Sequence, residues 1–132
     1  MKRLLKFSWF LLLGGLLLLF LGCGAGHPTL TGISVSPSTA TATVATRGTV
    51  GYTATGMFSD HSSRQLTQAD GLTWSTANGL IAGVSNSGIA TCVRAGVVTV
   101  SATAPSNLTI TVSNTVQNTS PKVTGSAGLT CM

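Results

Sequence analysis

The sequence predicts an all-β domain, an antiparallel β-sandwich of about seven short strands that follows a cleaved signal helix. Two features of the 132-residue chain support this prediction. Apolar and small polar residues alternate in short runs through the middle of the chain, and turn-forming residues separate these runs. A basic and then strongly apolar segment precedes them, which is the layout of a secretory signal.

The start of the chain has the composition of an export signal. Lys2, Arg3 and Lys6 form a basic beginning, and residues 7–21 are almost all apolar. This apolar run is shorter than the roughly 20 residues that a membrane-spanning helix usually needs. We therefore expect export followed by cleavage, with a retained membrane anchor as the second choice.

The junction Phe20-Leu21-Gly22-Cys23 resembles the lipobox of bacterial lipoproteins, in which the cysteine is linked to diacylglycerol before the signal is cut. Gly22 and Gly24 supply the small side chains that such a cut requires. Phe20 stands where the family prefers leucine, so cleavage at another position stays open. The resemblance implies that Cys23 is the lipid-attachment residue, and several acyl chains would make a stable membrane tether.

Cleavage before Cys23 leaves 132 − 22 = 110 residues, which is enough for one domain of ordinary size. We assign residues 1–22 to the lipoprotein signal peptide and 23–29 to a linker. Residues 30–116 are assigned to the β-sandwich. Residues 117–132, rich in small polar side chains, are assigned to a flexible C-terminal tail.

The formal charge of +5 lies mostly in the signal, which carries three of the seven basic residues. The remaining chain has four cations against two aspartates, a net charge of 4 − 2 = +2. The four cations are scattered along the sequence: Arg47, Arg64, Arg94 and Lys122. A nucleic-acid partner is therefore not expected, because its binding face would require clustered positive charge.

Five runs of the mature chain alternate apolar residues with threonine, serine or glycine. They lie at 33–35, 50–54, 72–74, 98–102 and 108–112. Successive strand residues point to opposite faces, so each run has one apolar face, as in antiparallel sheets that are buried on one side. Their number and spacing favour an immunoglobulin-like sandwich with a break at Pro37 and with Trp74 at the centre of the core.

Several segments also resemble a bacterial Ig-like domain of the group 2 type, found in intimin- and invasin-like surface proteins. These segments are ISVSP at 33–37, GTV at 48–50, YTATG at 52–56, FSD at 58–60, LTWS at 72–75, IAGVSNSG at 81–88, AG at 95–96 and VTVSA at 98–102. His61 stands where such domains often have a turn glycine, and Cys92 stands where a small residue is usual. The resemblance implies a structural, spacer or adhesive role.

Cys92 and Cys131 are a candidate disulfide pair, since a lipidated Cys23 would leave these two thiols in an oxidising compartment. On the chain-entropy model, the bridge would close a loop of about 40 residues and add about 4 kcal/mol to the free energy of unfolding. The alternative is two unpaired thiols, one of them in the tail.

The segment from Asp60 to Arg64 is the one place where catalytic residue types gather. Asp60, His61, Ser62 and Ser63 are the residue types of a hydrolytic triad, but they lie side by side in one turn. A triad requires the base to lie between nucleophile and acid in space, and two ligands do not make a metal site. We expect no catalytic residue, cofactor or metal, with an enzyme or ligand-binding protein that uses this turn as the alternative.

The sequence thus favours a non-catalytic module, lipid-anchored in the bacterial cell envelope. The resemblance to lipoproteins favours the outer membrane or cell surface, because Gly24 replaces the aspartate that retains many of them at the inner membrane. The expected partners are the membrane and a surface protein or carbohydrate. Self-association is a further expectation, because the strands lack the lysines that discourage edge pairing. A remnant of a larger surface adhesin is the other alternative.

Overall fold

A computed structural model of the chain describes residues 26–108 and 118–132. Its strands are β1 (Leu30–Ser36), β2 (Thr39–Ala42), β3 (Thr49–Gly51), β4 (Thr53–Phe58), β5 (Ser63–Gln65), β6 (Thr73–Thr76), β7 (Ala82–Val84), β8 (Ile89–Cys92), β9 (Gly96–Pro105) and β10 (Lys122–Cys131), and a short 3-10 turn, η2 (Gln68–Asp70), lies between β5 and β6. The described residues do not include the expected signal or Cys23. They include only the first residue of the strand expected at 108–112.

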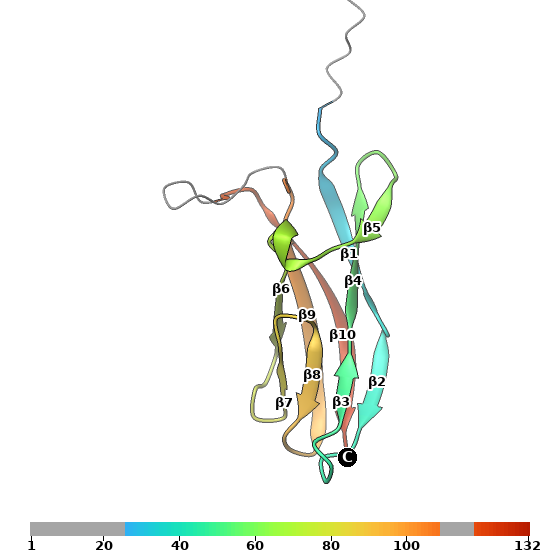
Figure 1. Ribbon diagram of the computed structural model, residues 1–132, viewed down its shortest axis with the longest axis vertical. Helices are drawn as coiled ribbons and strands as arrows, with labels where there is room; N and C mark the ends of the chain where they lie inside the picture. Colours follow the sequence, from blue (N-terminus) through green and yellow to red (C-terminus); the bar gives the residue numbers. More distant parts are fainter. Residues whose placement is uncertain (1–25, 109–117) are drawn as a thin grey trace, which may run out of the picture.

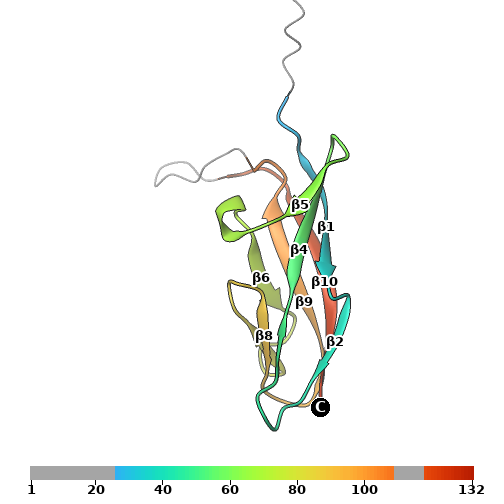
Figure 2. The same ribbon diagram turned by 45° about the vertical axis from the view of Figure 1, so that its right-hand side comes forward.

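The strands form two facing layers, which Figures 1 and 2 show from two directions. One layer is a four-stranded sheet in the order β2-β10-β9-β6. The other contains the sheets β1-β4-β5 and β3-β8-β7, which are joined because only Tyr52 separates β3 from β4 along the chain. The pairings are antiparallel except that β2 runs parallel to β10. The all-β, antiparallel prediction is therefore confirmed.

The chain changes layer at Pro37. β1 pairs with β4 and ends at Ser36, whereas β2 begins at Thr39 and pairs with β10 in the opposite layer. The peptide bond between Ser36 and Pro37 is cis. The expected strand break at this position is therefore confirmed. Its physical reason is that proline has no backbone N–H to donate to a ladder.

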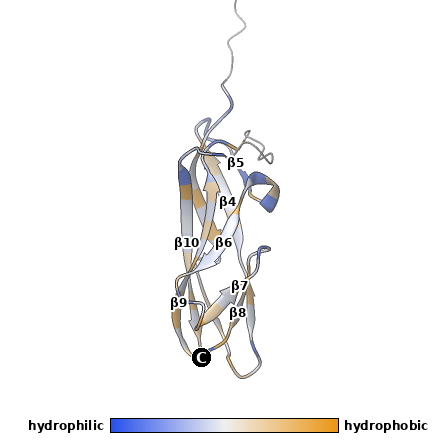
Figure 3. Cartoon of the chain, turned by 90° about the vertical axis from the view of Figure 1, so that its left-hand side faces the viewer, coloured by the Kyte–Doolittle hydropathy of each residue, from blue (hydrophilic) through white to orange (hydrophobic). Residues whose placement is uncertain are grey.

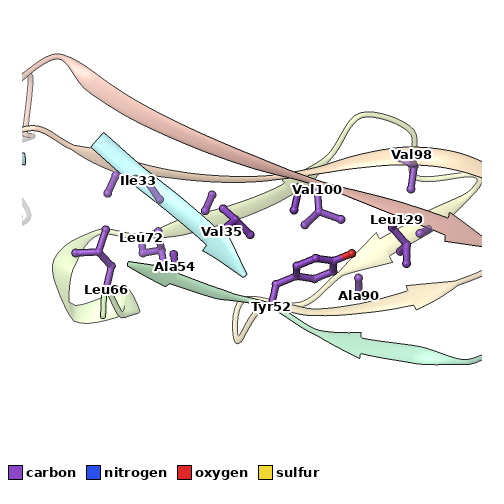
Figure 4. Packing of buried hydrophobic residues seen from close by; sticks show 14 of the residues in the cluster. Ile33, Val35, Tyr52, Ala54, Leu66, Leu72, Ala90, Val98, Val100 and Leu129 are labelled. Carbon is purple, nitrogen blue, oxygen red and sulfur yellow. The ribbon is translucent and has the colours of Figure 1, made fainter. Parts of the chain in front are cut away.

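The core lies between the layers and centres on Tyr52, whose side chain Figure 4 shows beside Val100, Leu129 and Ala90. Val100 and Leu129 have no exposed surface, and Tyr52 is only 3% exposed. The Tyr52 hydroxyl donates a hydrogen bond to the carbonyl oxygen of Gly128 at 2.9 Å. This single bond connects the β3–β4 junction to β10 across the core.

Trp74 is not at the centre of the core, contrary to the prediction. It lies on β6, which is an edge strand of its sheet, and its side chain is only partly buried. An edge strand has a neighbour on one side only, so an inward-facing side chain there meets the rim of the core. Tyr52, at the junction between β3 and β4, takes the central position instead.

The C-terminal segment is a long strand rather than the predicted flexible tail. β10 lies between β2 and β9, and its ten residues pair with the whole length of β9. Its inward positions are small or apolar: Val123, Gly125, Ala127, Leu129 and Cys131. These residues alternate with outward polar ones, but the small size of several of them gave the segment the composition of a loop.

Small size is required on β10 because β1 crosses it closely. A methyl group built on Gly125 would collide with the backbone carbonyl group of Ile33 on β1. A methyl group on Gly128, three residues further along the same strand, would meet Thr39 at 3.7 Å, an ordinary van der Waals distance. The two layers can therefore approach at Gly125 only because that residue has no side chain.

We predict that Gly125→Ala lowers the free energy of unfolding by about 1–3 kcal/mol, the usual range for overpacking a core. Backbone atoms cannot rotate away as a side chain can, so the strands must separate. Urea denaturation measures the change. Gly128→Ala is the matched control on the same strand and should change stability by less than about 0.5 kcal/mol. Equal losses in the two variants would contradict the close approach.

We predict that Tyr52→Phe lowers the free energy of unfolding by about 0.5–1.5 kcal/mol, since it removes the bond to Gly128 and keeps the ring. Burial raises the pKa of the Tyr52 hydroxyl above its ordinary value of 10.0. The folded state thus favours the neutral phenol. The contribution of this phenol to the free energy of unfolding is complete below pH 10.0 and is lost as pH rises through the folded-state pKa.

Because Tyr52 is the one tyrosine in the sequence, ultraviolet titration of the phenol measures this pKa directly. Urea denaturation of the wild type and of Tyr52→Phe across the same pH range then compares the two slopes. A wild-type stability that fails to decline more steeply than that of the variant would contradict the buried hydrogen bond.

Candidate functional site

Cys92 and Cys131 form a disulfide that joins the two layers. Cys92 ends β8 and Cys131 ends β10, and both are almost completely buried. Their Cα atoms are 5.6 Å apart, within the range that a disulfide spans. The bridge lies inside the core and so has a structural position, with no exposed sulfur for chemistry.

The turn at Asp60 connects β4 to β5 and is held by its own hydrogen bonds. The Asp60 carboxylate accepts hydrogen bonds from the Ser62 hydroxyl at 2.6 Å and the Ser62 backbone N–H at 3.0 Å. These two bonds hold the Asp60 pKa below its ordinary value. His61 has a φ of 65°, in the left-handed region that favours glycine.

This geometry brings Asp60 and Ser62 together but does not make a triad. In a triad the histidine accepts the nucleophile's proton and the acid orients the histidine. Here the Ser62 hydroxyl donates directly to the Asp60 carboxylate, so the imidazole of His61 is not between them. A shallow cavity of about 440 Å³ beside the turn is lined by Phe58, Arg64 and neighbouring residues.

Arg64, which follows this turn on β5, forms a salt bridge with Asp70. Its guanidinium donates two hydrogen bonds to the Asp70 carboxylate, at 2.6 and 3.0 Å, and lies 5.4 Å above the centre of the Phe58 ring. Asp70 also accepts a hydrogen bond from the Thr67 backbone N–H at 2.9 Å. The bonds from Arg64 and then from Thr67 hold the pKa of Asp70 below its ordinary value.

The paired charges position η2, the short coil between β5 and β6 whose largely hydrophilic colouring is visible in Figure 3. Asp70 is the last residue of η2, while Arg64 belongs to β5. Gly71 follows with a φ of 76° and ends the turn in the left-handed conformation. The ion pair therefore fixes the segment that crosses from one layer to the other.

An open groove of about 410 Å³, which we call the Trp74 groove, lies beneath this crossing segment. The apolar side chains of Leu66 and Leu72 form its floor, and Trp74 of β6 also lines the groove. Gln65, Thr67, Gln68 and Ala69 border one side, and Asn86 and Ser87 border the other. The two sides come from the β5–η2 segment and from the turn between β7 and β8.

The turn between β7 and β8 is held by local hydrogen bonds and by one glycine. The Ser85 hydroxyl pairs with the Ser87 hydroxyl at 2.8 Å and accepts from the Ile89 backbone N–H at 3.1 Å. Gly88 donates its N–H to the Ser85 carbonyl at 3.0 Å, and its φ of 81° suits the left-handed position. A methyl group on Gly88 would also press against the Trp74 ring at 3.0 Å, so the indole rests on this glycine.

From the sequence we expected no catalysis from residues 60–64 and kept them only for the alternative of an enzyme or ligand-binding protein. The structure uses Asp60, Ser62 and Arg64 in local structural bonds. Sequence reasoning placed Trp74 in the core and did not select the amides that border the groove. The signal that could have found them is the position of Trp74 between two turn segments that carry side-chain amides.

The described residues contain no group of three histidine, cysteine, aspartate or glutamate side chains that could hold a metal ion. Within the same ranges, no helix has the length and apolar character needed to cross a membrane. A comparison with family models and with curated proteins gives no match for this chain.

We predict that Asp70→Asn lowers the free energy of unfolding at neutral pH by about 1 kcal/mol. The bidentate pair loses its charge, but Arg64 is half exposed and solvent screens part of the effect. Because the folded-state pKa of Asp70 is lowered, its stabilisation is present above the ordinary value of 3.8 and is lost as pH falls through the folded-state pKa.

Asp60→Asn is the matched control, since Asp60 and Asp70 are the two acidic side chains of the whole sequence. Urea denaturation at pH 7 and at pH 3 compares the two variants. The loss of stability on acidification should be smaller in Asp70→Asn than in Asp60→Asn. The opposite order would show that Asp70 and Arg64 do not form the stronger pair.

Proposed function

We propose that this chain is a lipid-anchored module of the bacterial cell envelope, in which an Ig-like β-sandwich serves as a spacer or adhesive domain without catalysis. The observation that carries the proposal is the placement of the chain ends on the sandwich. In Figure 1 the described chain enters at the end that carries the β4–β5 turn and leaves at the opposite end. Such a domain extends from its attachment point, as a spacer must.

The strand order supports the Ig-like part of the proposal. One layer contains β1, β4 and β5 together with β3, β8 and β7, and the other contains β2, β10, β9 and β6. The first strand divides into β1 and β2, which pair with opposite layers, and β2 runs parallel to the last strand. The basic immunoglobulin plan has two antiparallel layers of four and three strands. The ten strands among the described residues include a first strand that is divided into β1 and β2, and a second pair, β3 and β4, that only Tyr52 separates.

The disulfide supports the location. A bridge between Cys92 and Cys131 persists in an oxidising compartment and is rare in the cytosol. This argument is independent of the apolar start of the chain, which supports export through residue types alone. The two lines of reasoning agree on a site outside the cytoplasm. A lipid on Cys23 would then hold one end of the sandwich toward the membrane and direct the other end away from it.

Intact mass spectrometry of the protein purified from host membranes, with and without reduction, tests the proposal. We expect the mass of residues 23–132 plus acyl chains, and an increase of two daltons after reduction of the Cys92–Cys131 bridge. Cys23→Ala is the variant that should lose the acyl mass. Cys92→Ala should keep the acyl mass and lose the response to reduction.

Two outcomes would overturn the anchored module. A mass that starts at Met1 would mean an uncleaved anchor, and a shorter species without lipid would mean a secreted domain. A hydrolytic activity lost in Asp60→Ala or His61→Ala, with folding intact, would favour the enzyme alternative.

A further inference from the structure

We infer that the Trp74 groove binds a neutral oligosaccharide, a role that deepens the adhesive part of the proposed function and rests on it. The inference follows from the chemistry of the lining: one partly exposed indole, an apolar floor, unpaired amides on both sides and no charge. Sugars offer two kinds of surface, apolar C–H faces and a rim of hydroxyl groups. The groove offers a complement to each.

Trp74 supplies the surface for an apolar sugar face. Its side chain is partly buried, with one part of the ring against Gly88 and another part lining the groove. The indole N–H makes no hydrogen bond to a described residue, and no buried side-chain donor lacks a partner in that part of the chain. The N–H therefore reaches solvent, where it is available to a ligand hydroxyl. Aromatic rings with a polar edge suit such mixed contacts.

Three side-chain amides stand at the edges of the groove: Gln65 and Gln68 on one side and Asn86 on the other. All three residues are exposed, and their amide groups form no hydrogen bond with any described residue. Each amide offers two donors and one acceptor. A sugar hydroxyl can therefore either accept a hydrogen bond from the amide N–H or donate one to the amide oxygen. The neighbouring Thr67 and Ser87 add hydroxyl groups to the same rim.

The lining contains no charged residue, which argues for a neutral ligand. The nearest charged groups on the same segment, Arg64 and Asp70, are paired with each other at 2.6 Å and do not offer a free charge. An anionic saccharide would find no cation in the groove to offset its loss of water. A volume of about 410 Å³ falls within the roughly 300–1,000 Å³ that small-molecule sites occupy, which fits a short stretch of sugar chain.

The groove is also fixed before any ligand arrives. The ion pair and the Thr67–Asp70 bond hold the η2 side, and the Ser85 hydroxyl holds the turn on the other side. The Tyr52 backbone N–H donates to the Gly88 carbonyl at 2.8 Å and connects that turn to the β3–β4 junction. A prearranged site loses less conformational entropy on binding, which matters for ligands held by few contacts.

Isothermal titration calorimetry of the full-length protein, purified in lauryldimethylamine oxide so that no sugar-headed detergent competes, tests the inference. The probes are three neutral hexaoses: β-1,4-linked glucose, β-1,4-linked N-acetylglucosamine and α-1,4-linked glucose. Hexagalacturonate is the charged counterpart. We expect at least one neutral probe to bind with a Kd of roughly 10⁻⁵–10⁻³ M and hexagalacturonate to bind more weakly.

Variants of the rim locate the site. Gln68→Ala and Asn86→Ala should each weaken binding by about 2- to 12-fold, the effect of losing one neutral hydrogen bond. Both variants should unfold at the wild-type urea concentration, because neither side chain has a partner among the described residues. Ser126→Ala, an exposed polar position on β10 away from the groove, should bind as the wild type does. Trp74→Ala should weaken binding by tenfold or more, and Trp74→Phe by less, since it keeps an aromatic ring.

The inference is overturned if none of the neutral probes binds to folded protein, if the rim variants bind unchanged, or if hexagalacturonate binds best. The mass of the same preparation reports lipidation independently of saccharide binding. A lipidated protein without saccharide binding would reject the groove alone. An unlipidated protein that binds sugar through Trp74 would reject the anchor and leave the groove.

Discussion

The last strand, β10, holds the two layers together. It pairs with β2 on one edge and with β9 along ten residues on the other, and its backbone passes directly beneath β1 at Gly125. It also accepts the hydrogen bond from Tyr52 and carries one half of the disulfide. Backbone pairing, close packing, a buried hydrogen bond and a covalent link therefore act on one strand, so the other strands depend on its position.

The edges of the sandwich are less constrained than this centre, and the Trp74 groove lies at one of them. β6 has a neighbour on one side only, so Trp74 faces a rim that is closed by turns and not by another strand. Local polar bonds, such as Asp70 with Arg64, hold those turns where sheet pairing cannot. The rigid core thus supplies a fixed platform, and the turns at its edge supply the chemical groups. This division is common in all-β binding domains, where loops on a sandwich carry function.

The anchor and the groove give a consistent physical picture of the proposed role. A lipid at Cys23 would place the sandwich at a membrane surface, and the long axis of the domain would direct its far end outward. Weak contacts to a neutral saccharide suit such a tethered domain, because many copies on one surface bind together and gain effective concentration. The Cys92–Cys131 bridge would help to keep the domain folded outside the cytoplasm, where disulfides persist.

Local sequence patterns determined much of this protein: the alternating strands, the break at Pro37 and the left-handed turns depend on near neighbours along the chain. Tertiary structure alone decided the role of β10, since its small side chains become meaningful only once β1 crosses at Gly125. It also decided the place of Trp74, because the sequence cannot say which strand lies at an edge. Contacts between residues far apart in sequence settle such questions, and a single alternating pattern contains no information about its distant partner.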